Sequence, residues 1–320
     1  MKTYKKLSVI CLALVLAISF SACSSASQPS VDNTQKQVQV LNFGAMASVE
    51  MIPIIMAEEN GYFEKQGIDV NLQTFKNSKD RDAALQSGNL DGIISDEVAV
   101  ALYQNAGLGV KITGLTDGNF VLVASPNSGI KAIEDIKGKS VAISEKTVIE
   151  YTFDKIMEKN GLDPKVVQKS IIPAMPTRLE MLRTGKVDTA LLPEPFATLA
   201  VKDGGLVLGS ANEADMYTSI TAFTQDSIDN KSNEIKAFFK AYNEAVDYVN
   251  STPISQYEDI IIKTVGYPQD MKGQIVLPKF RKNVLPSEQD IQSVIEWTKK
   301  NNLLNKELSP KDLVSNIGID

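Results

Sequence analysis

The sequence predicts an α/β protein with two lobes, each a mainly parallel sheet with helices on both faces. Short apolar runs alternate with amphipathic segments from Val38 onward, which is typical of strand–helix–strand units. The alternation restarts after residues 125–129, and one segment of the first half recurs in the second. A chain of 320 residues is also longer than one compact core usually supports.

The first half follows this pattern closely. Apolar runs predict strands at 38–43, 68–75, 91–95, 110–115 and 120–124. The intervening segments predict helices at 50–60, 80–87 and 96–105. Gly61 and Gly88 follow the first two of these helices, where a glycine commonly ends a helix.

The second half repeats the order and then becomes mostly helical. Strands are expected at 139–144, 171–173, 187–192, 206–208 and 219–223. Helices are expected at 147–160, 177–184 and 194–201, with Gly161 and Gly185 ending the first two. Further helices are expected at 233–250, 254–264, 269–276 and 287–301.

An internal repeat supports two related lobes. Residues 81–97 align with residues 178–194 at a constant offset of 97. The identical pairs are Arg81/Arg178, Leu85/Leu182, Gly88/Gly185, Asp91/Asp188 and Glu97/Glu194. In each copy a predicted helix is followed by a glycine that ends it, an aspartate, an apolar strand and an acidic residue after the strand. Ligands of open α/β sheets bind outside the carboxyl ends of strands, so both exits are candidate binding positions.

Composition excludes several classes of function. The chain has no histidine and two cysteines, Cys11 and Cys23, so a Ser-His-Asp triad, a Cys-His dyad and histidine-ligated zinc are excluded. The formal charge of −6 argues against a nucleic-acid partner. No calcium-loop pattern occurs. Gly138-Lys139-Ser140 is similar to the end of a phosphate-binding loop, but Ile133 stands where the first glycine is required and the triplet precedes a predicted strand instead of following one. We therefore expect no cofactor and no metal.

The N-terminal segment is typical of an export signal. Lys2, Lys5 and Lys6 precede an apolar stretch at 7–20, which is about 21 Å long as a helix and short for a membrane span. The Ser21-Ala22-Cys23 ending resembles the bacterial lipobox, which implies a signal at 1–22 and lipidation of Cys23. Phe20 stands where that motif usually has a leucine. Ordinary secretion with cleavage near Ala22 is the alternative.

Residues 23–37 are expected to be a lipidated cysteine followed by a flexible tether, because the segment is polar and contains Pro29. Loss of 1–22 removes three lysines and lowers the net charge from −6 to −9. The remaining chain has one cysteine, so it cannot form an internal disulfide. A domain tethered in this way would stay at the outer face of a membrane.

Polar residues at the strand exits are the candidate ligand-binding groups. Hydroxyls at predicted helix starts can bind anions or cap the helix. Carboxylates there can bind a ligand or simply favour the helix N-terminus. Glu194 lies between Pro193 and Pro195, which restrict its backbone. The candidates are Met46, Ser48, Ser95, Asp96, Asp117, Ser144, Thr147, Glu194 and Phe196.

The chain resembles the ABC-transporter substrate-binding proteins of the nitrate, sulfonate, taurine and thiamine-pyrimidine-precursor group. The resemblance covers about 38–304 and rests chiefly on Gly61, Tyr62, Phe63 and Gly67 and on the D-x-A-L-L-P-E-P run at 188–195. It implies a type II periplasmic-binding-protein-like fold that closes on its ligand by a hinge. The lobes would be 38–123 with 224–320, and 124–223, with hinges at 122–125 and 222–224. The implied partners are a permease and its ATPase, and the protein would be a monomer.

The ligand stays open at this point. A sulfonate or nitrate would use hydroxyls and helix N-termini, with Ser48, Ser144 and Thr147 as candidates. A pyrimidine-like or cationic ligand would use a carboxylate, with Glu194 as the candidate. Alternatives in other classes are an enzyme of a cofactor pathway and a tethered sensory module. The related fungal synthase consumes its own histidine, which this chain lacks.

Overall fold

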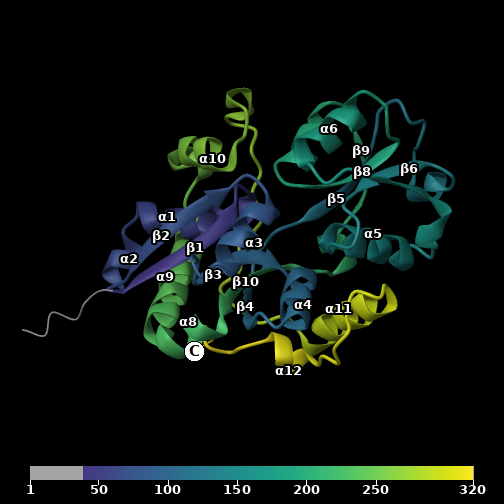
Figure 1. The fold of residues 1–320 in the computed structure, drawn as a ribbon. Helices are drawn as coiled ribbons and strands as arrows, with labels where there is room; N and C mark the ends of the chain where they lie inside the picture. The colour runs from purple at the N-terminus through teal and green to yellow at the C-terminus, as the bar shows by residue number, and fades with distance from the viewer. Residues whose placement is uncertain (1–38, 320) are drawn as a thin grey trace, which may run out of the picture. The chain divides into compact units, whose positions relative to one another are not determined.

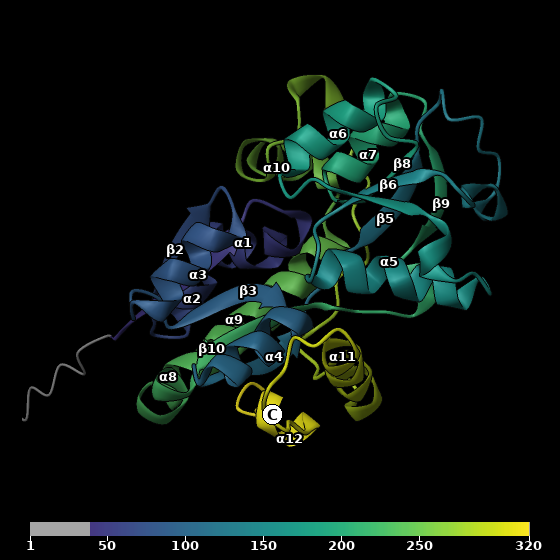
Figure 2. The same ribbon diagram turned by 45° about the vertical axis from the view of Figure 1, so that its right-hand side comes forward.

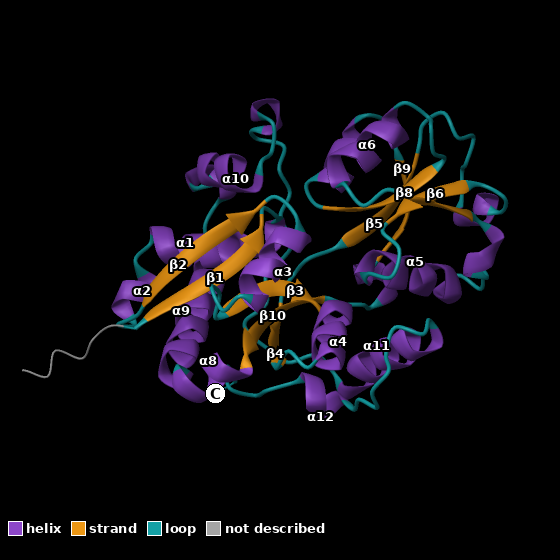
Figure 3. Ribbon diagram, in the orientation of Figure 1, coloured by secondary structure: helices purple, strands orange, loops and turns teal. Residues whose placement is uncertain are grey.

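Two five-stranded sheets organise the chain (Figure 1; Figure 3 shows the strands in orange). This computed structural model describes residues 39–319. Residues 38–320 form one compact unit. The predicted signal, the predicted lipidation of Cys23 and the predicted tether lie outside the described residues.

Each sheet has four parallel strands and one antiparallel strand. The first sheet runs in the order β2-β1-β3-β10-β4, and the second runs in the order β7-β6-β8-β5-β9. β10 is antiparallel to β3 and β4, and β5 is antiparallel to β8 and β9. The first sheet contains β1 (Val40–Met46), β2 (Asp69–Phe75), β3 (Gly92–Asp96), β4 (Val110–Leu115) and β10 (Ser219–Thr224). The second contains β5 (Phe120–Ala124), β6 (Ser140–Ile143), β7 (Gln168–Ile171), β8 (Thr189–Pro193) and β9 (Leu206–Ser210).

Helices cover both faces of each sheet (Figures 1 and 2). With the first sheet lie α1 (Ile52–Glu59), α2 (Tyr62–Lys65), α3 (Ser78–Gln86), α4 (Glu97–Ala106), α8 (Gln225–Asn230), α9 (Ser232–Ser251), α10 (Glu258–Val265), α11 (Glu288–Lys300) and α12 (Pro310–Leu313). With the second lie α5 (Val148–Lys159), α6 (Met175–Arg183) and α7 (Phe196–Lys202). Short 3-10 turns are η1 (Val49–Met51), η2 (Ile133–Ile136), η3 (Pro164–Val166), η4 (Asn212–Ala214), η5 (Ile254–Gln256) and η6 (Gln269–Met271).

The strands bury both of their faces, which explains their continuous apolar runs. Successive side chains of a strand point to opposite faces, so Ile93 and Ile94 of β3 enter different cores. Ile94 packs with α1 and α9, whereas Ile93 packs with α4. The core that includes Ile93 also contains Leu122 of β5 and Phe153 of α5, so one hydrophobic cluster is shared by the two lobes.

The internal repeat is confirmed as a structural repeat. Gly88 and Gly185 both have positive φ, +77° and +67°, immediately after α3 and α6. The side chain of Asp91 accepts a hydrogen bond from the backbone N–H of Asn42 on β1, at 2.8 Å. Asp188 accepts the equivalent bond from the backbone of Ser140 on β6, also at 2.8 Å. Each aspartate therefore ties the start of the central strand, β3 or β8, to the neighbouring strand, β1 or β6.

The predicted lobe boundaries differ from the observed ones. Every residue of β5 pairs with β8, and most also pair with β9; every residue of β10 pairs with β3, β4 or both. The chain therefore passes between the sheets at 116–119 and 211–218, before these strands begin, and not at 122–125 and 222–224. The expectation was wrong because each crossing is followed by a strand inserted completely into the other sheet.

Two predicted elements also differ. The strand expected at 171–173 is β7, which lies earlier, at Gln168–Ile171. The helix expected at 269–276 is only the turn η6, because Gly273 adopts a left-handed conformation with φ +78°. The other strands and helices expected from the sequence are present, with ends shifted by a few residues. The sequence did not predict the short helices α2, α8 and α12.

Candidate functional site

The carboxyl ends of the central strands form the candidate site. β1 and β3 end at Met46 and Asp96, and β8 ends at Pro193. Asp96 pairs with Ser219, the first residue of β10, and Pro193 pairs with Phe120, the first residue of β5. Both crossovers therefore begin or end beside these strand exits, where ligands of open α/β sheets bind.

Glu50 also lies in the first-lobe part of this region, although it is not among the candidates expected from the sequence. Burial raises the pKa of the Glu50 carboxyl, and a hydrogen bond from the Glu50 backbone N–H and the charge of Arg81 partly offset that effect. Gly118 of the first crossover packs against this carboxyl, since a Cβ atom there would lie 3.2 Å from Glu50 Cδ. Ser48 donates from Oγ to the Met46 carbonyl at 3.1 Å. Met46 and Ser48 are thus linked to each other directly before Glu50.

Asp96 begins α4 and caps it. Its Oδ1 accepts from the Ala99 backbone N–H at 2.8 Å, as expected for an N-cap residue. Burial raises the pKa of Asp96 to about 6, against the lowering effects of the helix N–H groups and of Arg81. Ser95 accepts a hydrogen bond from Arg81 Nη2 at 3.2 Å. Ser95 and Asp96 therefore both lie within the influence of a buried arginine.

Asp117, in the first crossover, is hydrogen-bonded to Arg281 from a distant part of the chain. Its two oxygens accept from the backbone N–H and the Nε of Arg281, at 2.8 and 2.6 Å. The Arg281 guanidinium lies 3.8 Å from the centre of the Tyr217 ring, which belongs to the second crossover. Asp117 and Arg281 therefore fasten both crossovers to the segment at 281, and both carboxylate oxygens of Asp117 already have partners. Arg281 and Tyr217 are not among the candidates expected from the sequence, because no local pattern indicates them.

The second-lobe hydroxyls have distinct roles. Thr147 caps α5, since its Oγ1 accepts from the Ile149 N–H at 3.2 Å and donates to the Ser144 carbonyl at 2.9 Å. Ser144 directly follows β6, and its Oγ accepts from Arg178 Nη2 at 2.7 Å. In the sequence, Arg178 stands out only as a member of the internal repeat. Its identity with Arg81 is the one sequence signal that indicates a shared role.

Glu194 lines a small pocket of about 170 Å³ within the second lobe, formed with Val121, Ala197, Thr198, Val201 and Val207. Its Oε2 accepts from the Thr198 N–H at 3.1 Å, so one oxygen caps the start of α7. The buried Tyr267 of the first lobe is close enough that the charge of Glu194 adds to the effect of burial in raising its pKa. Phe196, the first residue of α7, is partly buried and packs against the apolar cluster that contains Leu182.

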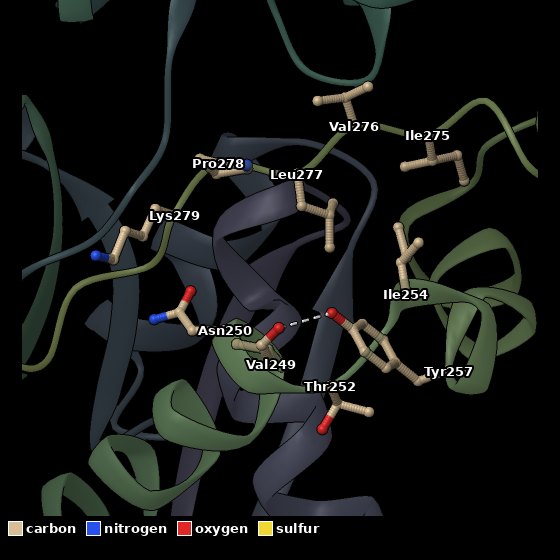
Figure 4. Close-up of a pocket in the computed structure, with 10 residues that line it drawn as sticks. All are labelled: Val249, Asn250, Thr252, Ile254, Tyr257, Ile275, Val276, Leu277, Pro278 and Lys279. Atoms are coloured by element: carbon tan, nitrogen blue, oxygen red, sulfur yellow. Dashed lines mark hydrogen bonds between the residues drawn. The ribbon is translucent and has the colours of Figure 1, made fainter.

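A larger pocket, of about 420 Å³, lies elsewhere in the first lobe (Figure 4). The end of α9, the turn η5 and the segment 275–279 line it, and Tyr257 closes one side by donating to the Val249 carbonyl at 3.0 Å. None of the candidate residues from the sequence lines this pocket. Within residues 39–319 no group of three or more His, Cys, Asp or Glu side chains could hold a metal ion. No helix of this part of the chain is both long and apolar enough to cross a membrane.

Two sheets of this topology, surrounded by helices and linked by two crossovers, define a periplasmic-binding-protein-like fold. The periplasmic aliphatic sulphonate binding protein SsuA from Escherichia coli has a similar structure, with a TM-score of 0.75 over 86% of this chain and 97% of that chain, at 18% identity. The periplasmic nitrate-binding protein NrtA from Synechocystis PCC 6803 gives a TM-score of 0.66 over 86% of this chain and 84% of that chain, at 15% identity. The fold expected from the sequence is confirmed.

The family follows from the sequence match. Residues 48–256 match the family described as NMT1/THI5 like, and the chain belongs to this family. A protein of Brucella abortus (strain 2308) that is named as a binding protein is 27% identical over 216 residues, which cover 65% of this chain and 66% of that protein. THI13 of Saccharomyces cerevisiae, named as a 4-amino-5-hydroxymethyl-2-methylpyrimidine phosphate synthase, is 22% identical over 229 residues, 66% of each chain. The matches span just under two thirds of the length of these relatives.

Proposed function

We propose that this chain is the solute-binding component of an ABC importer. It would capture a small organic molecule or anion between its lobes and deliver it to a membrane permease driven by an ATPase. The observation that supports this most is the set of polar groups at the strand ends of both lobes, on a fold shared with sulphonate- and nitrate-binding proteins. Two crossovers at 116–119 and 211–218 would serve as the hinge for closure.

Two ligand classes fit the strand ends. A sulfonate or nitrate would be bound by hydroxyls and backbone N–H groups, with Ser48 and Ser144 as the first candidates. A nitrogen heterocycle would be bound through its ring or amino N–H by a carboxylate, for which Glu194 has one oxygen without a hydrogen-bond donor among the described residues. Glu50 and Asp96 would add acceptors on the first-lobe side.

Thermal unfolding of residues 24–320 with a ligand panel tests the proposal. The panel contains taurine, alkanesulfonates, nitrate, aminopyrimidines, thiamine and riboflavin. A ligand at 100 times its Kd stabilises the folded state by about 2.7 kcal/mol, which should raise the Tm by several degrees. A shift with one class identifies the ligand class. If no member of the panel shifts the Tm of protein that has been unfolded and refolded to remove bound material, neither proposed class is the ligand.

Catalysis is the alternative, because some relatives are named as synthases. A binding protein releases its ligand unchanged, whereas an enzyme alters it. Mass spectrometry of the ligand after prolonged incubation with stoichiometric protein separates the two. We expect the mass to be unchanged, and a new product that depends on the protein would favour the enzyme.

The location is also part of the proposal. We propose export through residues 1–22 and attachment through a lipid on Cys23 at the outer face of the membrane. Replacing Cys23→Ser should release the protein from the membrane fraction, because the lipid chains supply the membrane affinity. Fractionation followed by immunoblotting measures the change. Membrane attachment that persists in this variant without lipid would contradict the lipoprotein proposal.

A further inference from the structure

Arg178 is an unusual buried charge. Its side chain is 0% exposed. The guanidinium donates to the carbonyls of Leu191 and Ile172, at 2.7 Å from Nη1 and at 3.1 and 3.0 Å from Nε and Nη2. Its remaining short contact is from Nη2 to Ser144 Oγ, at 2.7 Å. All of these acceptors are neutral, and no carboxylate of residues 39–319 lies within ion-pair distance of this arginine.

The equivalent arginine of the first lobe is neutralised. Arg81 donates to the Ile94 carbonyl at 2.8 Å, which matches the bond from Arg178 to Leu191 at the same offset of 97. Arg81 also forms an ion pair with Asp82, at 2.9 Å from Nε and 2.7 Å from Nη2. The repeat places Leu179 where the first lobe has Asp82. A single aspartate-to-leucine difference thus leaves the second-lobe arginine without a counter-ion.

A buried and unpaired guanidinium lowers the stability of the folded protein, because desolvation of a charge is costly. Burial lowers the pKa of Arg178 to about 10, and no carboxylate of residues 39–319 is near enough to oppose that effect. A negative group hydrogen-bonded to Ser144 would supply the missing compensation.

Ser144 connects this charge to the candidate site. It follows β6 directly, at the carboxyl end of the strand. Its Oγ accepts from Arg178, so its own hydrogen is available for donation. Among the described residues no acceptor takes that hydrogen. A hydroxyl that accepts from a guanidinium is polarised and becomes a stronger donor.

We propose that Arg178 is a specificity-determining residue that acts through Ser144, whose hydroxyl donates to an electronegative oxygen of the ligand in the second lobe. Arg178 itself does not touch the ligand; it is a positioning residue that polarises the donor and holds it in place. The inference rests on the proposed binding function. It assigns the electronegative end of the ligand to the second lobe, opposite the carboxylates of Glu50 and Asp96 in the first lobe.

A thiol probe tests the charge without any ligand. The full chain with Cys11→Ser and Cys23→Ser is combined with Ser144→Cys or, as the matched control beside the neutralised arginine, with Ser95→Cys. The thiol pKa is read from the pH dependence of alkylation by iodoacetamide. We expect the pKa at position 144 to lie below the ordinary value of about 8.5 and at least about one unit below that at position 95. A value at position 144 equal to or above that at position 95 would overturn the proposal.

A second variant restores the missing counter-ion. Leu179→Asp should give Arg178 the partner that Arg81 has, and so raise the thiol pKa of the Ser144→Cys protein towards that of the Ser95→Cys control. Circular dichroism establishes that this protein is folded. If the variant folds and the thiol pKa stays low, Arg178 is not the source of the effect. If it does not fold, the comparison of the two single-cysteine proteins still decides the proposal.

Ligand binding supplies the last comparison, with ethanesulfonate and 4-aminopyrimidine as probes in calorimetry. Ser144→Ala should weaken ethanesulfonate binding roughly tenfold or more, while leaving the aminopyrimidine within about threefold of the parent protein. Equal losses for both probes would contradict a role specific to the electronegative group. If the parent protein binds neither probe, the proposed ligand classes fail, and the thiol pKa alone decides the role of Arg178.

Discussion

Glu194 shows how one carboxylate can serve the fold and still be available to a ligand. Its Oε2 accepts from the Thr198 N–H at the start of α7, at 3.1 Å. Its other oxygen has no donor among the described residues. A glutamine can keep the bond to Thr198 through its carbonyl oxygen while losing the negative charge. The side chain can therefore be altered with little effect on the helix that follows it.

Glu194→Gln tests the heterocycle-binding role. We expect affinity for an aminopyrimidine to fall by roughly tenfold or more, because a charge-assisted hydrogen bond becomes a neutral one or is lost. The Tm of the free protein should change little. Calorimetry measures the affinity, and Glu180→Gln on the neighbouring helix α6 is the control. An unchanged affinity would remove Glu194 from the site.

Asp96→Asn tests the buried acid of the first lobe. The pKa of Asp96 is raised on folding, to about 6 from an unfolded value of about 3.9, so the folded state binds more protons in this range. The favourable contribution of Asp96 is therefore present below about pH 4 and is lost as the pH rises through about 6. An asparagine keeps the cap on Ala99 and is neutral throughout.

The Tm of the Asp96→Asn protein relative to the parent should therefore rise between about pH 4 and about pH 8. Calorimetric melts of the two proteins side by side cancel the other titrating groups, apart from the nearby Arg81 and Asp82. A difference in Tm that stays constant or falls with pH would show that Asp96 is ionised at no cost in the folded protein.

At the scale of the element, α3 and α6 end in the same way. Gly88 donates to the Leu85 carbonyl and Asn89 to the Ala84 carbonyl, at 3.1 and 3.0 Å. Gly185 and Lys186 repeat the two bonds to Leu182 and Met181, at 3.1 and 2.9 Å. This pattern satisfies the last carbonyls of the helix and requires a left-handed residue, for which glycine is the least strained choice. After these two endings the chain continues into β3 and β8. Each of these strands has a candidate site residue at its carboxyl end or directly after it.

Gly88→Ala and Gly185→Ala should each lower the free energy of unfolding by about 1 kcal/mol, because alanine is strained at positive φ. A Cβ atom at Gly88 would meet no atom within 4 Å, so steric overlap does not contribute there. Urea unfolding measures the change. Gly88→Asn is the control and should cost less, since asparagine tolerates this conformation better. A loss as large with asparagine as with alanine would mean that the backbone conformation is not the cause.

At the scale of the whole molecule, α11 of the first lobe contacts α5 of the second. Trp297 Nε1 donates to Asp154 at 3.0 Å, and Tyr151 Oη lies 3.1 Å from Ser293 Oγ. The rings of Tyr151 and Trp297 meet edge to face with centroids 5.5 Å apart. Figure 2 shows α5 beside α4 and α11. Any motion of one lobe against the other changes the surroundings of Trp297, the only tryptophan of the chain.

Trp297 emission should therefore report lobe movement. We expect a ligand found in the thermal panel to change the intensity or wavelength of tryptophan emission, with saturation at the concentration given by calorimetry. Tyr151→Phe removes the hydrogen bond to Ser293 and should alter the size of the change without removing it. An emission spectrum that stays constant during saturation by a ligand would contradict closure about the two crossovers.

The sequence by itself determined the class of fold and most of its elements. Apolar runs and their spacing predicted the strands, the glycines at 88 and 185 marked two helix ends, and the repeat predicted two related lobes. These features are local, because periodicity and left-handed glycines act over a few residues. The pairs Asp91/Asp188 and Arg81/Arg178 were visible as identities, but their hydrogen-bond partners were not.

Only the tertiary structure decided which side chains are free and which are already bound. Asp117 was a candidate for the ligand, yet Arg281, 164 residues away in the chain, occupies both of its oxygens. Glu50 was not selected, yet folding places it against Gly118 of the first crossover. The lobe boundaries differ from the expected ones because β5 pairs entirely within the second sheet and β10 pairs entirely within the first. Burial, ion pairing and strand insertion depend on contacts between distant residues, which the local patterns of a single sequence do not specify.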